Sequence, residues 1–194
     1  MLTRRTLMWA APAAVVAGGA GLSGYMLLHR SPGHSPGGIG GPFTLVDGSG
    51  KTVTDADFAG KWMLVYFGYT HCPDACPTAL QDMANAVDML DPAQRKKVAI
   101  VFITVDPARD TPAVMRDYVS NFAAPIVPLS GSPEQIAKAA KEYRVYYAKH
   151  PTEDGYEMDH SSIIYVMNPE GDFVANFTHE SSPKQIAAKL HALV

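Results

Sequence analysis

Residues 68–77 read Gly68-Tyr69-Thr70-His71-Cys72-Pro73-Asp74-Ala75-Cys76-Pro77 and contain both cysteines of the chain. An apolar run at residues 62–67 precedes this segment and predicts a buried strand. Apolar residues then recur at the spacing of an α-helix, namely at Leu80, Met83, Ala84, Val87 and Leu90. The cysteines are therefore expected at a strand-to-helix turn. Unpaired N–H groups and the positive end of the helix dipole meet there, and both favour thiolate over thiol.

Strands and helices alternate through the rest of the chain. Short strands at residues 43–46 and 51–53 predict an N-terminal β-hairpin. Further strands are expected at 98–105, 126–129, 145–148, 162–167 and 172–177, and helices at 78–90, 112–122, 132–143 and from 182 onward. Residues 149–159 are polar and are expected to form a loop. This order predicts an α/β fold with a mixed central sheet flanked by helices, and the position of the cysteines favours a thioredoxin-like arrangement.

Three of the expected helices begin with a capping signature. Thr111 can cap a helix that starts at Pro112. Residues 132–135 and 182–185 read Ser-Pro-Glu-Gln and Ser-Pro-Lys-Gln, which is the pattern of a capping box. These signals make the helix starts the best-defined boundaries in the sequence.

Charge and cysteine content exclude some classes of protein. The 194 residues carry 16 basic and 19 acidic side chains, a balance that argues against a nucleic-acid partner. Two cysteines cannot form the disulfide framework of a small secreted domain. Ordinary apolar burial must therefore hold the core.

The chain is expected to have three parts. Residues 1–30 predict a targeting segment, because two arginines precede the uncharged, mostly apolar stretch from Leu7 to Leu28. That stretch is about 22 residues long, enough to span a bilayer, and the arginines place the remainder of the chain outside the cytoplasm. Residues 31–42 are rich in Pro and Gly and predict a linker. Residues 43–194 then form the folded domain.

The targeting segment has two other readings. Ala11-Pro12-Ala13 offers a small-residue cleavage site, so the segment can also be a removed signal peptide. Thr3-Arg4-Arg5-Thr6-Leu7 is similar to a twin-arginine export signal. We expect an uncleaved anchor in the inner membrane with the domain in the periplasm, and a soluble periplasmic form as the alternative. Every reading puts the cysteines where thiols tend to oxidise.

The two cysteines are close enough to bridge one metal ion, and a third ligand must then come from elsewhere in the chain. The candidates are the histidines His71, His150, His160, His179 and His191. We favour His160, because it directly precedes the strand expected at 162–167. In thioredoxin-like folds the residue before that strand faces the active-site cysteines. His71 is expected to tune the thiol or to be exposed.

Two thiolates and one imidazole form a soft donor set. Such a set suits Cu(I), zinc or iron–sulfur clusters, and imidazole also accepts Cu(II). Zinc normally takes four ligands at a structural site, whereas three are enough for Cu(I). The sequence therefore favours copper, one ion per chain, over zinc.

Less specific roles remain open for the same residues. The cysteine pair can be a plain structural disulfide, although closing a three-residue loop gains little entropy. Asp74 and Asp159 can accept hydrogen bonds near the metal or can be ordinary loop carboxylates. Residues 105–112, Val-Asp-Pro-Ala-Arg-Asp-Thr-Pro, are expected to end a strand and cap a helix. Within them Asp106, Arg109 and Asp110 are expected to form a local, structural ion pair.

Three motifs in this order resemble the SCO/SenC family of copper proteins. They are the cysteine segment at 68–77, the segment at 105–112, and Asp-His-Ser at 159–161. The resemblance covers about residues 43–194 and implies a thioredoxin-like fold. It also implies that Cys72, Cys76 and His160 bind one copper ion.

The resemblance implies two functions that need not exclude each other. One is a metallochaperone that delivers copper to the dinuclear copper centre of cytochrome c oxidase. The other is a thiol–disulfide oxidoreductase, in which Cys72 attacks a partner disulfide and Cys76 resolves it. A peroxidase is a distant third. The implied partners are the copper-accepting oxidase subunit, other periplasmic copper chaperones and thioredoxin-like reductants.

Overall fold

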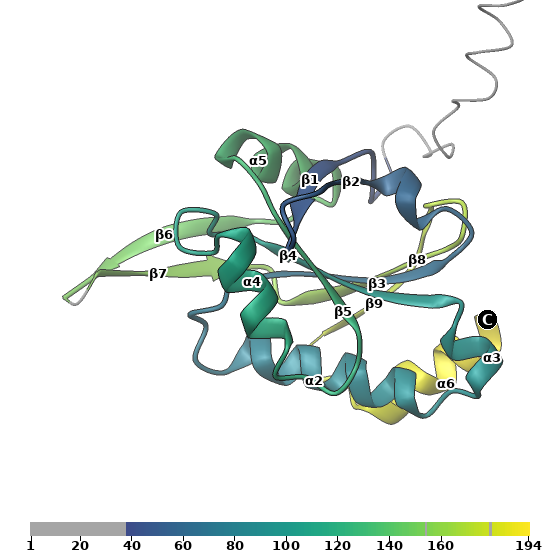
Figure 1. Cartoon of the computed structure of the whole chain (residues 1–194). Coiled ribbons are helices and arrows are strands. Elements are labelled where there is room, and N and C mark those ends of the chain that lie inside the picture. Colours follow the sequence, from purple (N-terminus) through teal and green to yellow (C-terminus); the bar gives the residue numbers. More distant parts are fainter. Residues whose placement is uncertain (1–37, 154, 179) are drawn as a thin grey trace, which may run out of the picture. The chain divides into compact units, whose positions relative to one another are not determined.

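The computed structural model describes residues 38–153, 155–178 and 180–194. A mixed seven-stranded sheet runs through this part of the chain, in the order β2-β1-β5-β4-β3-β8-β9 (Figure 1). Its strands are β1 (Thr44–Asp47), β2 (Thr52–Thr54), β3 (Trp62–Gly68), β4 (Val98–Thr104), β5 (Ile126–Ser130), β8 (Ile163–Met167) and β9 (Phe173–Thr178). β3, β4 and β5 are parallel, and the other pairings are antiparallel. The thioredoxin-like fold expected from the sequence is confirmed.

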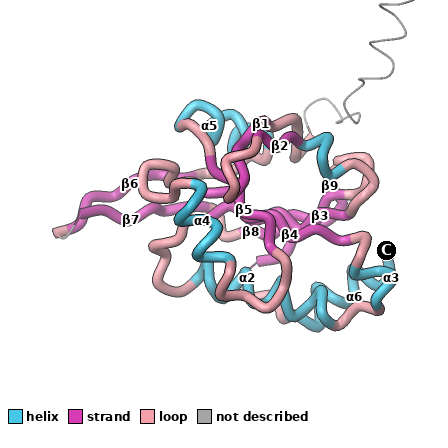
Figure 2. Tube along the Cα trace, in the orientation of Figure 1, coloured by secondary structure: helices cyan, strands magenta, loops and turns pink. Residues whose placement is uncertain are grey.

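Helices cover both faces of the sheet. In chain order they are the 3₁₀ helix η1 (Asp55–Phe58), α2 (Ala75–Asp88), α3 (Pro92–Arg95), α4 (Pro112–Val119), α5 (Pro133–Glu142) and α6 (Pro183–Leu193). α2 and α6 lie side by side below the sheet, and α5 lies above it (Figures 1 and 2). α4 packs against β5.

The centre of the sheet is built from strands that the helices bury on both faces. β3 is buried from Met63 to Gly68, and β4 is buried from Ile100 to Thr104. Continuous apolar runs of this kind are typical of parallel strands under helices, because neither face meets water. The cysteine segment follows β3 directly, so a strand that is buried along almost its whole length supports one half of the site.

The capping signals set the helix starts. The side chain of Thr111 accepts a hydrogen bond from the N–H of Val114, and Pro112 is the first residue of α4. Ser132 and Ser182 each form the expected capping box with the glutamine three positions later. Several boundaries differ from the sequence prediction by a few residues. Among the helices the largest differences are that α2 starts at Ala75, ahead of the expected residue 78, and that α4 ends at Val119, ahead of the expected residue 122.

The N-terminal hairpin extends the central sheet at one edge. β1 pairs with β2 as predicted and also with β5. The segment from Leu7 to Leu28, for which the sequence predicts an anchor, and the linker up to residue 37 lie outside the described residues. Among the residues that are described, no helix is long and apolar enough to cross a membrane.

The prediction that residues 149–159 form a loop is wrong. They belong to an antiparallel hairpin of β6 (Tyr147–Thr152) and β7 (Gly155–His160), which forms a sheet of its own and projects from the body (Figure 1). We call it the histidine hairpin, because His160 is its last residue. Its outer positions, such as His150 and Glu157, are exposed. β6 is exposed from Lys149 to Thr152 and gives no strand signal, whereas β7 alternates between the half-buried Tyr156 and Met158 and their exposed neighbours, a pattern that the sequence prediction missed.

Candidate metal centre

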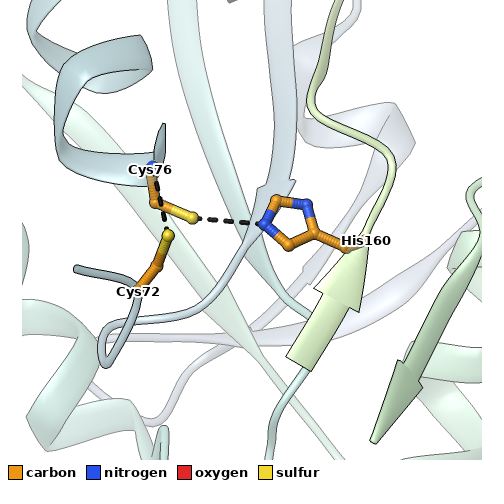
Figure 3. A group of neighbouring side chains, drawn as sticks. All are labelled: Cys72, Cys76 and His160. Carbon is orange, nitrogen blue, oxygen red and sulfur yellow. Dashed lines mark hydrogen bonds between the residues drawn. The ribbon is translucent and has the colours of Figure 1, made fainter. Parts of the chain in front are cut away.

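The two cysteines occupy different environments at the end of β3. Cys72 lies in the loop before α2 and is partly exposed, whereas Cys76 is the second residue of α2 and is fully buried. Both are free thiols. The backbone N–H of Cys76 donates to Cys72 Sγ over 3.4 Å, as expected for a sulfur at a helix N-terminus (Figure 3). In this structure the turn is thus held by a hydrogen bond between the two cysteines.

His160 meets this pair from the histidine hairpin. Its Nε2 lies 3.4 Å from Cys76 Sγ, and the imidazole points at the two sulfurs (Figure 3). One donor atom from each of Cys72, Cys76 and His160 lies within 4.8 Å of the others. Among the described residues this is the one group of its kind that can hold a metal ion.

The backbone next to His160 selects its tautomer. Nδ1 of the ring lies 3.3 Å from the carbonyl oxygen of Ser161. A carbonyl oxygen can only accept a hydrogen bond, so this contact puts the ring proton on Nδ1. Nε2 then keeps its lone pair and directs it at the sulfurs. Metal-binding histidines in proteins are commonly oriented by a second contact of this type.

The two thiols ionise very differently. A hydrogen bond from the Cys76 thiol lowers the pKa of Cys72 to about 3. The same contact between the sulfurs, together with burial, raises the pKa of the Cys76 thiol well above its usual range. At neutral pH Cys72 is thus the thiolate and Cys76 keeps its proton, so one negative charge is present before any metal binds.

Two tyrosine rings surround the imidazole. The rings of Tyr66 and Tyr69 stand edge-on to His160, with centroids 6.0 and 5.8 Å away. The hydroxyl of Tyr66 also lies 3.9 Å from Cys76 Sγ and donates to it. Both tyrosines are buried, so these contacts restrict the orientation of the imidazole and keep water from one side of the site.

The carboxylate of Asp110 holds the loop at residues 69–74, between β3 and α2, which we call the cysteine loop. It is fully buried and accepts hydrogen bonds from the Thr70 N–H, the Thr70 hydroxyl and the Thr104 hydroxyl, at 3.0, 2.6 and 2.7 Å. The sequence predicts a local ion pair of Asp106, Arg109 and Asp110. Instead Arg109 pairs with Asp106 alone, and Asp110 reaches 40 positions back along the chain. The sequence signal that could have indicated this contact was Thr70, a residue with a hydrogen-bonding side chain two positions before Cys72.

The other sequence candidates lie away from the sulfurs. His71 is half-exposed and its ring contacts the Thr70 hydroxyl. His150 lies on the outer face of the histidine hairpin, 3.8 Å from Asp159, which accounts for both residues without a metal. His191 is an exposed residue of α6. His179 is outside the described residues, and Asp74 is the exposed N-cap position of α2.

The donor set fits a soft metal ion. Two sulfurs and an unprotonated imidazole nitrogen suit copper or zinc, and the described surroundings supply no fourth ligand of the kind that a closed structural zinc site needs. Cys72 remains partly open to solvent, so a bound ion would be reachable by the ligands of another protein.

The fold and the site together define a thioredoxin-like protein in which a histidine from a hairpin faces a Cys-x-x-x-Cys pair. The chain belongs to the SCO1/SenC family, whose family model matches residues 32–194.

Relatives and solved structures agree with this family. The chain is 47% identical over 137 residues to the protein SCO1 homolog 1, mitochondrial, of Arabidopsis thaliana, an alignment that covers 70% of this chain and 41% of the relative. A structure described as Bradyrhizobium japonicum ScoI with copper bound is 47% identical, with a TM-score of 0.74 over 80% of this chain and 99% of that one. The chain spans about half the length of the curated relatives it matches.

A structure with lower sequence identity links the Sco family to the assembly of cytochrome c oxidase. It is described as showing a disulfide switch in BsSco, a member of the Sco family of cytochrome c oxidase assembly proteins. It is 26% identical, with a TM-score of 0.64 over 79% of this chain and 91% of that one.

Proposed function

We propose that this chain is a copper metallochaperone that holds one copper ion through Cys72, Cys76 and His160 and delivers it to the copper-accepting subunit of cytochrome c oxidase. The observation that carries the proposal is the meeting of three soft donor atoms within 4.8 Å from two segments far apart in the chain. A thioredoxin-like dithiol needs only the two sulfurs. An imidazole lone pair aimed at them is a metal ligand, and copper fits a three-ligand site best.

Family relatives support copper as the ion. The Bradyrhizobium japonicum protein, which is similar over four-fifths of this chain, is described with copper bound. We propose the dinuclear copper centre of the oxidase as the destination of the ion. This choice rests on the family resemblance and on the description of BsSco as an oxidase assembly protein.

The unequal exposure of the sulfurs suits release of the ion to a partner. Cys76 is buried inside the domain, whereas Cys72 is partly exposed. An incoming thiolate of the acceptor would bind the ion on the exposed side and displace Cys72 first. The remaining two ligands then leave as further acceptor ligands bind, so the ion is never free in solution.

A second function is favoured by the lowered pKa of Cys72. Its thiolate would attack a disulfide of the acceptor and form a mixed disulfide, and one acceptor cysteine would leave as a thiolate. Cys76, after losing its proton, would then attack Cys72. This step releases the second acceptor cysteine and leaves Cys72 and Cys76 joined, so two electrons pass to the acceptor. We propose this thiol–disulfide oxidoreductase activity as the alternative to copper delivery.

We further propose that residues 1–30 tether the domain to the inner membrane through the linker at 31–42, with the domain in the periplasm. The basic start and the apolar stretch after it support this location. A tether would hold the domain near the membrane-bound oxidase.

Copper delivery is tested by transfer to the isolated copper-accepting domain of an oxidase subunit. The full chain, purified in detergent, reduced and loaded with Cu(I), is mixed with the copper-free, reduced acceptor, and the copper content of each protein is measured after separation. We expect copper to move to the acceptor from the unaltered chain, and His160→Ala to bind too little copper to deliver any. Stable loading of His160→Ala with normal transfer would overturn the proposed site.

The oxidoreductase alternative is tested in the same pair of proteins without copper. The reduced chain is mixed with an acceptor whose cysteines are oxidised, and acceptor thiols are counted by alkylation. Reduction that survives in His160→Ala while copper transfer is lost would show two separable activities. Reduction alone, with no copper transfer by the unaltered chain, would favour the oxidoreductase.

A further inference from the structure

The motif at residues 105–112 contacts both halves of the candidate metal centre. Asp110 holds the cysteine loop through Thr70, as described above. Its neighbour Arg109 faces the other way and donates from Nη1 to the carbonyl oxygen of Tyr156 on β7, over 3.0 Å. Adjacent residues of one short loop are thus bonded to the segment that carries the cysteines and to the hairpin that carries the histidine.

The histidine hairpin needs such a contact, because it is not part of the central sheet. β6 and β7 pair with each other only, among the strands described. The hydrogen bond at its base, from the Ser161 N–H to the Tyr146 carbonyl oxygen, joins the two ends of the hairpin to each other. Tyr156 lies further out on β7, four residues before His160. The contact with Arg109 therefore joins the hairpin to the body of the domain at a point beyond its base.

The guanidinium group of Arg109 uses Nε and Nη1 for polar contacts and its planar face for ring contacts, while its buried Nη2 has no hydrogen-bond partner among the described residues. Its Nε pairs with Asp106, which is almost fully buried, and Asp106 also accepts a hydrogen bond from the Tyr156 hydroxyl over 2.9 Å. The guanidinium carbon lies 3.8 Å from the centre of the Tyr156 ring and 5.7 Å from that of Tyr69. Tyr69 belongs to the cysteine loop and stands edge-on to His160. A planar cation can satisfy all of these contacts at once, whereas a lysine ammonium cannot.

We propose that Arg109 is a positioning residue for copper, which clamps the histidine hairpin to the cysteine loop so that His160 meets the two sulfurs at the distance the ion requires. The clamp consists of Arg109, Asp106 and Tyr156. This inference rests on the proposed copper site. It assigns a role in metal binding to residues 105–112, for which the sequence predicts only a structural role.

The test is a double-mutant cycle on the full chain, with Arg109→Lys in the unaltered and the His160→Ala backgrounds. Copper affinity of the reduced protein is measured by competition with a Cu(I) chelator. Arg109→Lys is expected to weaken copper binding by about 10- to 100-fold, the usual effect of losing a residue that orients a ligand. In the His160→Ala background the same substitution is expected to change the affinity less than about twofold, because the ligand that it positions is already gone.

Arg116→Lys is the matched control. Arg116 also pairs with a neighbouring aspartate, Asp117, and donates to a backbone carbonyl, that of Gly48, but it lies on α4 and contacts neither half of the site. We expect its copper affinity to equal that of the unaltered chain. Equal losses from Arg109→Lys in both backgrounds, or no loss in either, would overturn the clamp.

A measurement without metal gives a second criterion. Hydrogen exchange of the copper-free chain should be faster in β6 and β7 of Arg109→Lys than in the unaltered protein, and unchanged in β3 and β4. Unchanged exchange in the hairpin would count against the clamp. If Arg109→Lys does not fold, Tyr156→Phe, which removes the hydroxyl bonded to Asp106 and keeps the ring, replaces it in both experiments.

The failures of the two proposals can be told apart. If His160→Ala binds copper as tightly as the unaltered chain, the copper site itself is wrong. If His160→Ala weakens binding and Arg109→Lys does not, only the clamp is wrong.

Discussion

The backbone of Gly68 lies against Cys76 so closely that a Cβ on residue 68 would stand 2.8 Å from Cys76 Sγ. The same Cβ would be 3.0 Å from ring atoms of Phe102 and Tyr66. All three neighbours are fully or almost fully buried, so none can move aside freely. Cys76 therefore has its position because the last residue of β3 has no side chain.

Gly68→Ala is accordingly expected to destabilise the domain by about 1–3 kcal/mol, the usual cost of overpacking a core. It should also weaken copper binding, since Cys76 must shift. Urea unfolding of the reduced, copper-free chain and a Cu(I) competition assay measure the two effects. An unchanged unfolding midpoint would show that the space beside the sulfur is larger than the structure indicates.

Loss of the histidine ligand should affect copper far more than fold. We expect His160→Ala to lower copper affinity by more than about 100-fold, because even residues that only orient a ligand contribute about 10- to 100-fold. His150→Ala is the control: His150 is on the same hairpin but lies on its outer face, near Asp159. His150→Ala should bind copper as tightly as the unaltered chain, so the copper affinities of the two variants should differ by more than about 100-fold. Similar affinities would remove His160 from the ligand set.

The unequal pKa values of the cysteines predict a pH profile for alkylation. A thiol with a pKa of about 3 is ionised at every pH above that value, so Cys72 in the folded, copper-free chain should react with iodoacetamide at pH 5 about as fast as at pH 7. Cys76, with its raised pKa, should stay unmodified at both. Peptide mass spectrometry distinguishes the two residues.

The urea-unfolded chain is the control for this profile. Both cysteines should then react with the pH dependence of an ordinary thiol, with a midpoint near 8.5. The folded environment thus favours the Cys72 thiolate between about pH 3 and 8.5, and this advantage is lost as the pH falls toward 3. A folded-state midpoint for Cys72 close to that of the unfolded chain would contradict the described contacts.

Asp110→Asn should destabilise the cysteine loop. The carboxylate accepts three hydrogen bonds, and an amide in its place has one acceptor oxygen and puts a donor next to Thr70 or Thr104. A buried donor left without a partner costs about 1–3 kcal/mol. Asp117→Asn, at an exposed position, is the control and should change the unfolding free energy by less than about 0.5 kcal/mol. Equal effects from the two substitutions would refute a special role for Asp110.

The sequence was most informative where local chemistry decides the structure. The strand before the cysteines is continuous and apolar, and the turn after it is marked by Pro77 in the first turn of α2. Ser132 and Ser182 fix helix starts through side chains only three positions away. Such interactions act over one turn of backbone, so the order of residues is enough to predict them.

The ligand set was also accessible, but only by combining the sequence with a fold. Nothing local to His160 marks it among the candidate histidines. Its place before β8, in a thioredoxin-like topology, singled it out, and the structure brings its Nε2 to the sulfurs.

Tertiary structure alone decided the remaining features. The histidine hairpin is exposed on its outer face and β6 lacks an apolar alternation, so its residues were predicted as a loop, and the main-chain pairing of β6 with β7 is seen only in the structure. Asp110 and Arg109 are adjacent in sequence and act on opposite sides, because the loop that carries them passes between the cysteine segment and the hairpin. The sequence by itself determined which residues carry candidate donor atoms, namely the two cysteines and the histidines. The packing of distant segments, which no local pattern encodes, decided which histidine meets the sulfurs and how the three side chains are held together.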